Sequence, residues 1–543
     1  MSSIYKNFCT EEFDEAGKLI KFDVKYPENY NFGYDVVDGI AKATPDKRAL
    51  VWCNTEGAER IFTFGEMSTL SNQVANVFLE NGIKKGDKVL VILKRHYEYW
   101  ITAVALHKIG AVIIPVTHML TVSDMVYRFK AAKVRAVITT PDDDVHERVL
   151  EAAKECDTII RLWSVQKDLQ GFQNLTKDME TAGTELVRQD TKATEPMLLY
   201  FTSGTTGYPK GVIHDHTYTL AHIVTAKHWQ QTIDGGLHFT VAETGWAKSS
   251  WGKIYGQWLT ESAIMVFDFD NFDPKQLITI INRYEVTTFC APPTVYRYLV
   301  KKGVSPMPSL KHACTAGEAL NPEVFKRFEE KTGLQIAEGF GQTESTLILG
   351  NLYGGDFKPG SMGKETPFYK VAVIREDGTE ADCGEVGELV VVPPEGKRQV
   401  GIFCEYLDNE AMYKHVWRGG VYHTGDTVWK DEEGYFWFNG RIDDVIKTGG
   451  FRVGPFEIEN VAMQHPAVME CAAVGVPDPL RGQAITLFAM LTSGYEATDD
   501  FAKEIKEFCN KKLAEYKWVR RVELVDEMPK TFSGKIRKVE LKK

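Results

Sequence analysis

The sequence predicts an α/β protein. It has a large N-terminal domain of two α/β subdomains plus a small β-barrel-like subdomain, and a small mobile α+β C-terminal domain. The chain has 543 residues, which is too long for a single hydrophobic core. Apolar runs of strand length alternate with stretches of helical spacing over residues 34–196, and the same rhythm returns after residue 210. Strands that alternate with helices are typical of parallel sheets covered by helices.

The first subdomain begins its clearest pattern at residue 86. A Gly-Asp-Lys turn at 86–88 leads into the apolar run 89–93, and residues 97–108 carry apolar side chains at helical spacing. Gly110 is placed to end that helix, and 111–115 is short and apolar enough for a buried strand. We expect these elements to form one βαβ unit, with a further strand at 135–139.

The second subdomain repeats this pattern further along the chain. Strands are predicted at 263–267, 286–290 and 310–313, with a helix over 273–284. Short strands punctuated by glycine, at 387–392 and 434–439, then indicate the β-barrel-like subdomain.

A change of composition after residue 442 marks the boundary between domains 1–442 and 443–543. The second of these shows its own βαβ-like order, with strand patterns at 468–476 and 484–491 and a helical pattern at 499–513.

Composition excludes several classes of function. The net charge is −11, from 64 basic and 75 acidic residues, so we expect no nucleic-acid partner held by a basic face. The nine cysteines show no C-x-x-C spacing, which argues against a zinc site and a disulfide framework. No apolar run approaches the roughly 20 residues of a membrane span. Because the N-terminus also shows neither a secretory signal nor an Arg-rich transit pattern, we predict a cytoplasmic protein.

The most specific local feature is a turn of hydroxylated and glycine residues between a strand-like run at 197–201 and Lys210. Backbone N–H groups and hydroxyls in such a turn can hold the phosphates of a nucleotide, and glycine lets the backbone approach them. It is not a Walker loop, which ends in Gly-Lys-Ser/Thr. Taken alone, such a turn could also be a solvated loop, which is the less favoured alternative. Its residues are Thr202, Ser203, Gly204, Thr205, Thr206, Gly207 and Lys210.

Four further stretches accompany this turn, at 315–320, 337–344, 422–426 and 440–454. Together with the turn, this set resembles the adenylate-forming superfamily of acyl-CoA synthetases, adenylation domains and luciferases. The resemblance runs from about residue 35 to the C-terminus, with the motifs in the order and spacing of that family. A chance match to all of them is implausible.

The resemblance implies a role for each motif. The turn would hold the ATP phosphates, Asp426 both ribose hydroxyls, and Arg441 the ribose or a phosphate. Thr343 would contact the α-phosphate, Glu344 would bind Mg²⁺, and Lys535 matches the catalytic lysine of the family. Gly317, Glu318 and Ala319 would line the adenine, with Phe340 stacking near it. The other residues implied in ATP or AMP binding are Gly339, Gly341 and Gln342.

The resemblance also implies a second substrate, CoA, and a moving domain. Asp443 matches the hinge, about which the small domain would rotate after the acyl-adenylate forms. Gly449, Gly450 and Arg452 would then line the channel for the CoA thiol. The partners are thus a small carboxylic acid, ATP and CoA, with Mg²⁺ as the metal; the sequence leaves a homo-oligomer open.

The acid itself is less clearly encoded. The segment 244–258 resembles the acetyl- and medium-chain branches. Its candidate pocket residues are Trp246 and Trp251, which could instead be core aromatics, and Lys248, which could instead gate the CoA channel or face solvent. Cys290, on a separate strand, is a candidate for the same pocket, with a buried structural thiol as the alternative. Acetate-specific members carry tryptophan where this chain has Gly341, so we expect an open pocket and a medium-chain or branched acid. Acetate, propionate or an aromatic acid remain alternatives. So do a domain that loads a carrier protein and an ATP-binding protein without catalysis.

Overall fold

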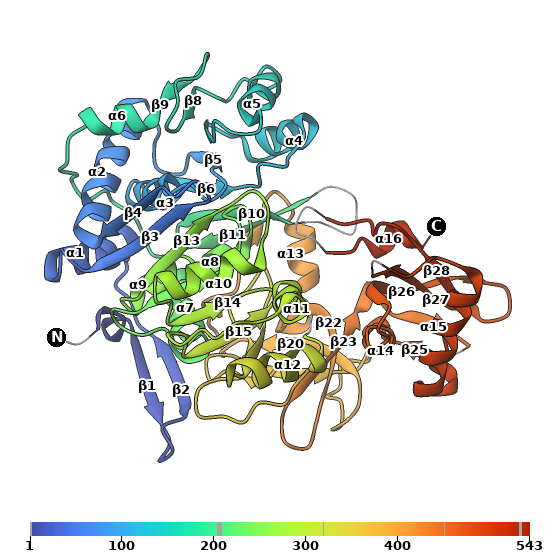
Figure 1. The fold of residues 1–543 in the computed structure, drawn as a ribbon. Coiled ribbons are helices and arrows are strands. Elements are labelled where there is room, and N and C mark those ends of the chain that lie inside the picture. Colours follow the sequence, from blue (N-terminus) through green and yellow to red (C-terminus); the bar gives the residue numbers. More distant parts are fainter. Residues whose placement is uncertain are drawn as a thin grey trace.

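The computed structural model describes residues 3–202, 209–318, 320–449, 451–492, 494–531 and 535–542. Five sheets and their covering helices make up these residues (Figure 1). The mixed α/β class predicted from the sequence is confirmed. Of the helices in these ranges, none is both long and apolar enough to cross a membrane.

The first subdomain contains an eight-stranded sheet in the order β21-β11-β10-β6-β5-β7-β8-β9. It is parallel from β10 to β9, and β11 and β21 extend it with antiparallel pairing. Its strands are β5 Lys88–Ile92, β6 Val112–Pro115, β7 Ala136–Thr139, β8 Arg161–Ser164, β9 Gln173–Asn174, β10 Pro196–Thr202, β11 Lys210–Asp215 and β21 Glu405–Tyr406. Its principal helices are α2 Phe64–Glu80, α3 Glu98–Lys108, α4 Val122–Ala132 and α5 Val145–Ala153.

The local sequence explains why these helices start where they do. Helix α2 begins with a capping box, in which the Thr63 hydroxyl accepts from the Glu66 N–H and the Glu66 carboxylate accepts from the Thr63 N–H. The α3 residues are buried on every side, which matches its run of apolar residues between two layers.

The second subdomain contains a nine-stranded sheet in the order β18-β17-β16-β15-β14-β12-β13-β3-β4. Its strands are β3 Arg48–Asn54, β4 Glu59–Thr63, β12 Leu237–Thr240, β13 Ala263–Asp268, β14 Thr288–Cys290, β15 His312–Ala316, β16 Ile336–Phe340, β17 Leu349–Gly350 and β18 Lys364–Glu365. Its outer helices are α10 Pro274–Arg283, α11 Pro293–Lys302 and α12 Pro322–Thr332.

One part of this sheet differs from the sequence-based expectation. Strands β3 and β4 precede the first subdomain along the chain, yet β3 pairs with β13 of the second sheet. The rhythm of strands and helices does not say which sheet a strand joins, because that depends on long-range pairing.

The predicted β-barrel-like unit is a four-stranded antiparallel sheet in the order β19-β20-β22-β23. Its strands are β19 Lys370–Ile374, β20 Gly387–Val392, β22 Tyr422–Lys430 and β23 Phe436–Arg441. Helix α13 Glu410–Val416 follows β21 and contacts β22.

Residues after 445 build a separate sheet, drawn in red at one side of Figure 1. The long hairpin of β26 and β27 is its main part, and Ile446, Ile458 and Ile505 lie in its own hydrophobic core. Its elements are β24 Ile446–Thr448, β25 Phe451–Val453, α14 Pro455–Ala462, β26 Val468–Asp478, β27 Gly482–Leu491, α15 Asp499–Lys512, β28 Arg521–Leu524 and α16 Lys538–Leu541.

Candidate active site

The ends of strands from three sheets meet at the site. Thr202 is the last residue of β10, Phe340 the last of β16 and Arg441 the last of β23. Thr202 lies opposite Lys210 across the β10–β11 pair, so the phosphate turn is the connection of an antiparallel hairpin. Ligands in open α/β sheets bind beyond the carboxyl ends of the strands, and the predicted motifs lie there.

Some predicted residues lie outside the described residues. They are Ser203, Gly204, Thr205, Thr206, Gly207, Ala319 and Gly450, and the side chain of Arg452 is likewise outside the description.

Glu344, the predicted metal ligand, is buried and makes an ion pair. Its Oε1 lies 2.7 Å from Lys210 Nζ and accepts a hydrogen bond of 2.9 Å from the Tyr406 hydroxyl. Burial alone would raise the pKa of the Glu344 carboxyl. The charge of Lys210 and the two hydrogen bonds outweigh burial, so the pKa is lower than usual and the group is ionised at neutral pH.

Asp426, the predicted ribose ligand, is buried beside Arg441. Its Oδ1 lies 3.3 Å from Arg441 Nη1, and its Oδ2 accepts from Gln342 Nε2 at 2.5 Å. Burial raises the pKa of Asp426 above its ordinary value, against the opposing charges of Arg441 and Lys535.

The adenine side of the predicted site lies at the end of β15. Gly317 takes φ +102°, a conformation that favours glycine, directly after the strand. Glu338 on β16 ties this turn to its surroundings, because its two carboxylate oxygens accept from the backbone N–H groups of Leu320 (3.2 Å) and Gly360 (2.8 Å). Burial raises the pKa of Glu338 to about 8.

A second residue without a predicted role holds Thr343. His214 on β11 donates from Nε2 to the Thr343 carbonyl at 2.7 Å. Burial lowers the pKa of His214 to about 4, so the ring is neutral at physiological pH. Neither His214 nor Glu338 was assigned a role from the sequence. The one signal in the sequence that could have identified them is a polar residue within an otherwise apolar strand.

The residues predicted to line the acyl pocket are closely packed. Lys248 Nζ donates to the Ala316 carbonyl at 2.8 Å, which turns this lysine toward the end of β15, and burial lowers its pKa. Trp251 is 7% exposed and packs edge-on against Trp229, with ring centroids 6.3 Å apart. Cys290 is buried on β14 in register with Cys314 on β15, and Trp246 precedes the short helix α8 Ala247–Gly252.

The expectation that Gly341 opens the pocket is wrong in this structure. A Cβ at residue 341 would lie 2.2 Å from Trp251 Cη2 and 2.5 Å from the Thr346 carbonyl oxygen. The indole of Trp251 therefore already occupies the space beside Gly341. The missing side chain makes room for a tryptophan from another segment and leaves no free volume next to it.

This contact predicts that Gly341→Ala destabilises the fold by about 1–3 kcal/mol through overpacking. The same substitution in a Trp251→Ala background should cost less, because one of the two close contacts is gone. Urea unfolding of the four proteins measures the coupling. Equal costs in both backgrounds would show that Trp251 does not fill this space. Gly341→Trp should then disrupt folding before it can alter the choice of acid.

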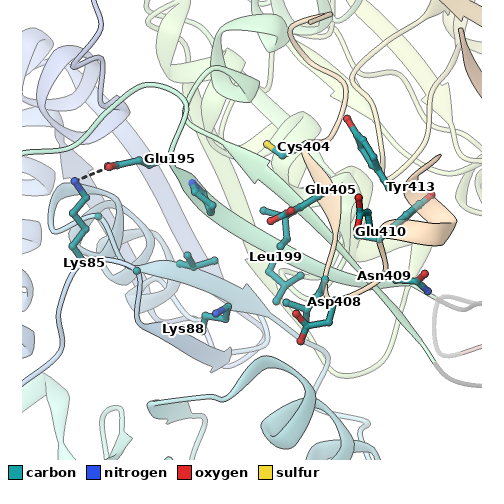
Figure 2. Close-up of a pocket in the computed structure, with 17 residues that line it drawn as sticks. Lys85, Lys88, Glu195, Leu199, Cys404, Glu405, Asp408, Asn409, Glu410 and Tyr413 are labelled. Carbon is teal, nitrogen blue, oxygen red and sulfur yellow. Dashed lines mark ion pairs between the residues drawn. The ribbon is translucent and has the colours of Figure 1, made fainter. Parts of the chain in front are cut away.

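A large cavity lies away from this site. It has a volume of about 1070 Å³ and is lined at the amino ends of β5, β6 and β10 by residues such as Lys85 and Lys88, and opposite them by 404–410 (Figure 2). None of the predicted site residues lines it. Tyr406 belongs to both places, because its ring borders the cavity and its hydroxyl contacts Glu344.

Comparison with known proteins gives the family. The family model for AMP-binding enzymes matches residues 37–396, and the model for their C-terminal domain matches residues 457–535. The chain belongs to the AMP-binding enzyme family. Acyl-coenzyme A synthetase ACSM3 of Mus musculus is 38% identical to this AMP-binding enzyme over 560 residues, covering 100% of the chain and 96% of the mouse protein.

Solved structures agree with this family. The anthranilate CoA ligase AuaEII in complex with anthranoyl-AMP aligns with a TM-score of 0.86 at 25% identity, covering 95% of this chain and 97% of that one. The acyl-CoA synthetase of Brucella canis aligns with a TM-score of 0.73 at 29% identity, covering 95% of each chain.

The comparisons also correct the predicted location. Mouse, rat and human ACSM3 are all named as mitochondrial proteins, which contradicts the cytoplasmic prediction. That prediction depended on the lack of a recognisable targeting pattern, and the lack of a pattern does not determine a compartment.

Proposed function

We propose that this AMP-binding enzyme is an acyl-CoA synthetase. It activates a carboxylic acid with ATP, forming acyl-AMP and pyrophosphate, and then transfers the acyl group to CoA with release of AMP. The observation that supports the proposal is a pair of buried carboxylates at the strand ends, with Glu344 beside Lys210 and Asp426 beside Arg441. The two carboxylates can accept from ribose hydroxyls and hold a cation, and the two basic side chains supply the positive charge that phosphates require.

The first half-reaction joins two anions, and the described cations offset their repulsion. The substrate carboxylate is ionised at neutral pH and needs no general base. Its oxygen attacks the α-phosphorus, and the bond from that phosphorus to the bridging oxygen of pyrophosphate breaks. Lys210 and Arg441 supply positive charge at the phosphates and the ribose, and Lys535 supplies it where charge develops on the leaving group.

Mg²⁺ fits the chemistry of Glu344. Within the described ranges, no group of three or more His, Cys, Asp or Glu side chains could hold a metal. A single buried carboxylate is the donor set expected for Mg²⁺ that arrives with ATP, since phosphate oxygens and water complete its shell. When bound, the ion neutralises phosphate charge. Glu344 would hold it there, and Thr343 is held alongside by His214.

The small domain would serve both halves of the reaction by rotation about Asp443. In the arrangement proposed for adenylation, Lys535 faces the nucleotide. The thiol of CoA must later reach the acyl carbonyl from a different side, past Gly449, Gly450 and Arg452. We place the domain boundary at residues 442 and 443 for this reason.

A medium-chain or branched acid is the substrate class we propose. Trp251 fills the space next to Gly341, and Cys290 is buried on β14. The segment 244–258, which resembles the acetyl- and medium-chain branches, supports this substrate class.

The test is a panel of acids from acetate through branched and medium chains to long-chain and aromatic acids. We expect acid-dependent exchange of labelled pyrophosphate into ATP, and AMP release that requires added CoA. Exchange without CoA-dependent AMP release would instead indicate a domain that loads a carrier protein. Nucleotide binding without exchange for any acid would contradict an enzymatic role.

A further inference from the structure

Glu344 is held by a residue that the sequence motifs did not include. Tyr406 is 3% exposed and places its hydroxyl 2.9 Å from Glu344 Oε1 and 3.0 Å from Lys210 Nζ. An ammonium group can only donate, so the hydroxyl accepts from Lys210 and gives its single proton to the carboxylate. The direction of both hydrogen bonds is thereby fixed.

The backbone around Tyr406 makes this contact rigid. Strand β21 pairs with β11 so that Tyr406 lies opposite Val212, next to the strand that begins at Lys210. The N–H of Phe403 donates to the Glu344 carbonyl at 2.8 Å, and the N–H of Leu407 donates to the Gly211 carbonyl at 2.8 Å. The segment 403–407 therefore connects the strand after the phosphate turn with the loop that carries Glu344.

Only one oxygen of Glu344 is engaged by these donors. Lys210 and Tyr406 both contact Oε1, and across the described ranges no side-chain donor is found on Oε2. Lys210 is also a predicted phosphate ligand, so it has two alternative anionic partners. When it turns to the phosphates of a nucleotide, the hydroxyl of Tyr406 is the described side-chain donor that stays on Oε1.

We propose that Tyr406 is a positioning residue for Glu344: its hydroxyl holds Oε1 so that Oε2 is presented to the cation that accompanies ATP. The proposal rests on the proposed function, which makes Glu344 the metal carboxylate. It goes beyond that function by assigning to segment 403–407 the task of orienting the carboxylate. Partners that orient a metal ligand in this way commonly change metal affinity by about 10–100-fold when removed.

Tyr406→Phe tests this with the loss of a single oxygen atom. The readout is binding, measured by titration calorimetry with the non-hydrolysable β,γ-methylene analogue of ATP, with and without Mg²⁺. In the parent protein Mg²⁺ should tighten binding of the analogue. In the variant we expect that tightening to fall by about tenfold, with little change in affinity for the metal-free analogue.

Tyr369→Phe is the matched control. Tyr369 is also 3% exposed, and its hydroxyl lies 2.6 Å from Thr346 Oγ1, two residues beyond Glu344. It loses the same buried hydroxyl without touching the carboxylate, so a general loss of packing or stability would affect both variants. We expect the effect of Mg²⁺ on analogue binding to stay within about twofold of the parent in this control, below the range that loss of an orienting partner produces.

Two outcomes would overturn the proposal: an unchanged Mg²⁺ effect in Tyr406→Phe, or an equal loss in Tyr369→Phe. A parent protein whose analogue binding ignores Mg²⁺ would overturn it as well. The effect of Mg²⁺ on analogue binding can be measured without any acid substrate. If the parent shows the Mg²⁺ effect but no acid-dependent exchange, the proposed function fails while the role of Tyr406 can still be judged.

Discussion

Lys535→Ala should reduce the formation of acyl-AMP by at least about 100-fold, the scale on which a single stabilising charge at a transition state contributes. Lys535 matches the catalytic lysine of the family, and we propose that it stabilises the leaving pyrophosphate. The second half-reaction has no pyrophosphate. Transfer from supplied acyl-AMP to CoA should therefore proceed at nearly the parent rate. Pyrophosphate exchange measures the first half and thioester formation from synthetic acyl-AMP the second.

Lys530→Ala is the matched control for this experiment. Lys530 belongs to the same basic tail, but its Nζ lies 2.8 Å from Glu470 Oε2 on β26 of the small domain. Removing it deletes the same charge from the tail without changing the site near Asp426. An equal loss of both half-reactions in Lys535→Ala, or an equal effect of Lys530→Ala, would refute the catalytic assignment.

The sequence predicted strands and helices best where the spacing of apolar residues agreed with the turn residues that flank them. The run before the phosphate turn became β10, and 89–93 became β5 almost residue for residue. The hairpin of β1 Cys9–Phe13 and β2 Leu19–Val24 was missed. It extends from the body in Figure 1 and has few buried residues, so its apolar alternation is weak. The placement of β3 in the second sheet was missed because pairing partners are not encoded locally.

The site was predictable to the extent that its residues lie in contiguous motifs. Asp426 and Arg441 fall in two such motifs, and the structure brings their side chains together. Tyr406 and His214 lie outside the motifs, and only the fold carries them to Glu344 and Thr343. The error at Gly341 has the same origin. Whether a glycine leaves empty space depends on which distant side chain packs against it, and here Trp251 does.

The proposed hinge at Asp443 makes a second strong prediction. Asp443 lies in the first turn of the short 3₁₀ helix η5 Ile442–Asp444, which links β23 to β24, and proline is tolerated in a first helical turn. Asp443→Pro should therefore preserve the present arrangement and leave acyl-AMP formation nearly unchanged. It should oppose the rotation that the CoA step needs, because proline fixes φ.

We expect thioester formation in Asp443→Pro to fall by on the order of 100-fold, since misplaced reacting groups slow an enzyme on that scale. Asp443→Ala is the control, because it removes the same carboxylate but leaves the backbone free to rotate, and both half-reactions should remain close to the parent rates. The Asp443 carbonyl also accepts from Lys542 Nζ at 3.1 Å, and both variants retain that carbonyl. The difference between the two variants thus reports on the backbone alone. Stopped-flow measurement of each half-reaction decides the matter: a loss of adenylation with an intact CoA step would place the hinge elsewhere.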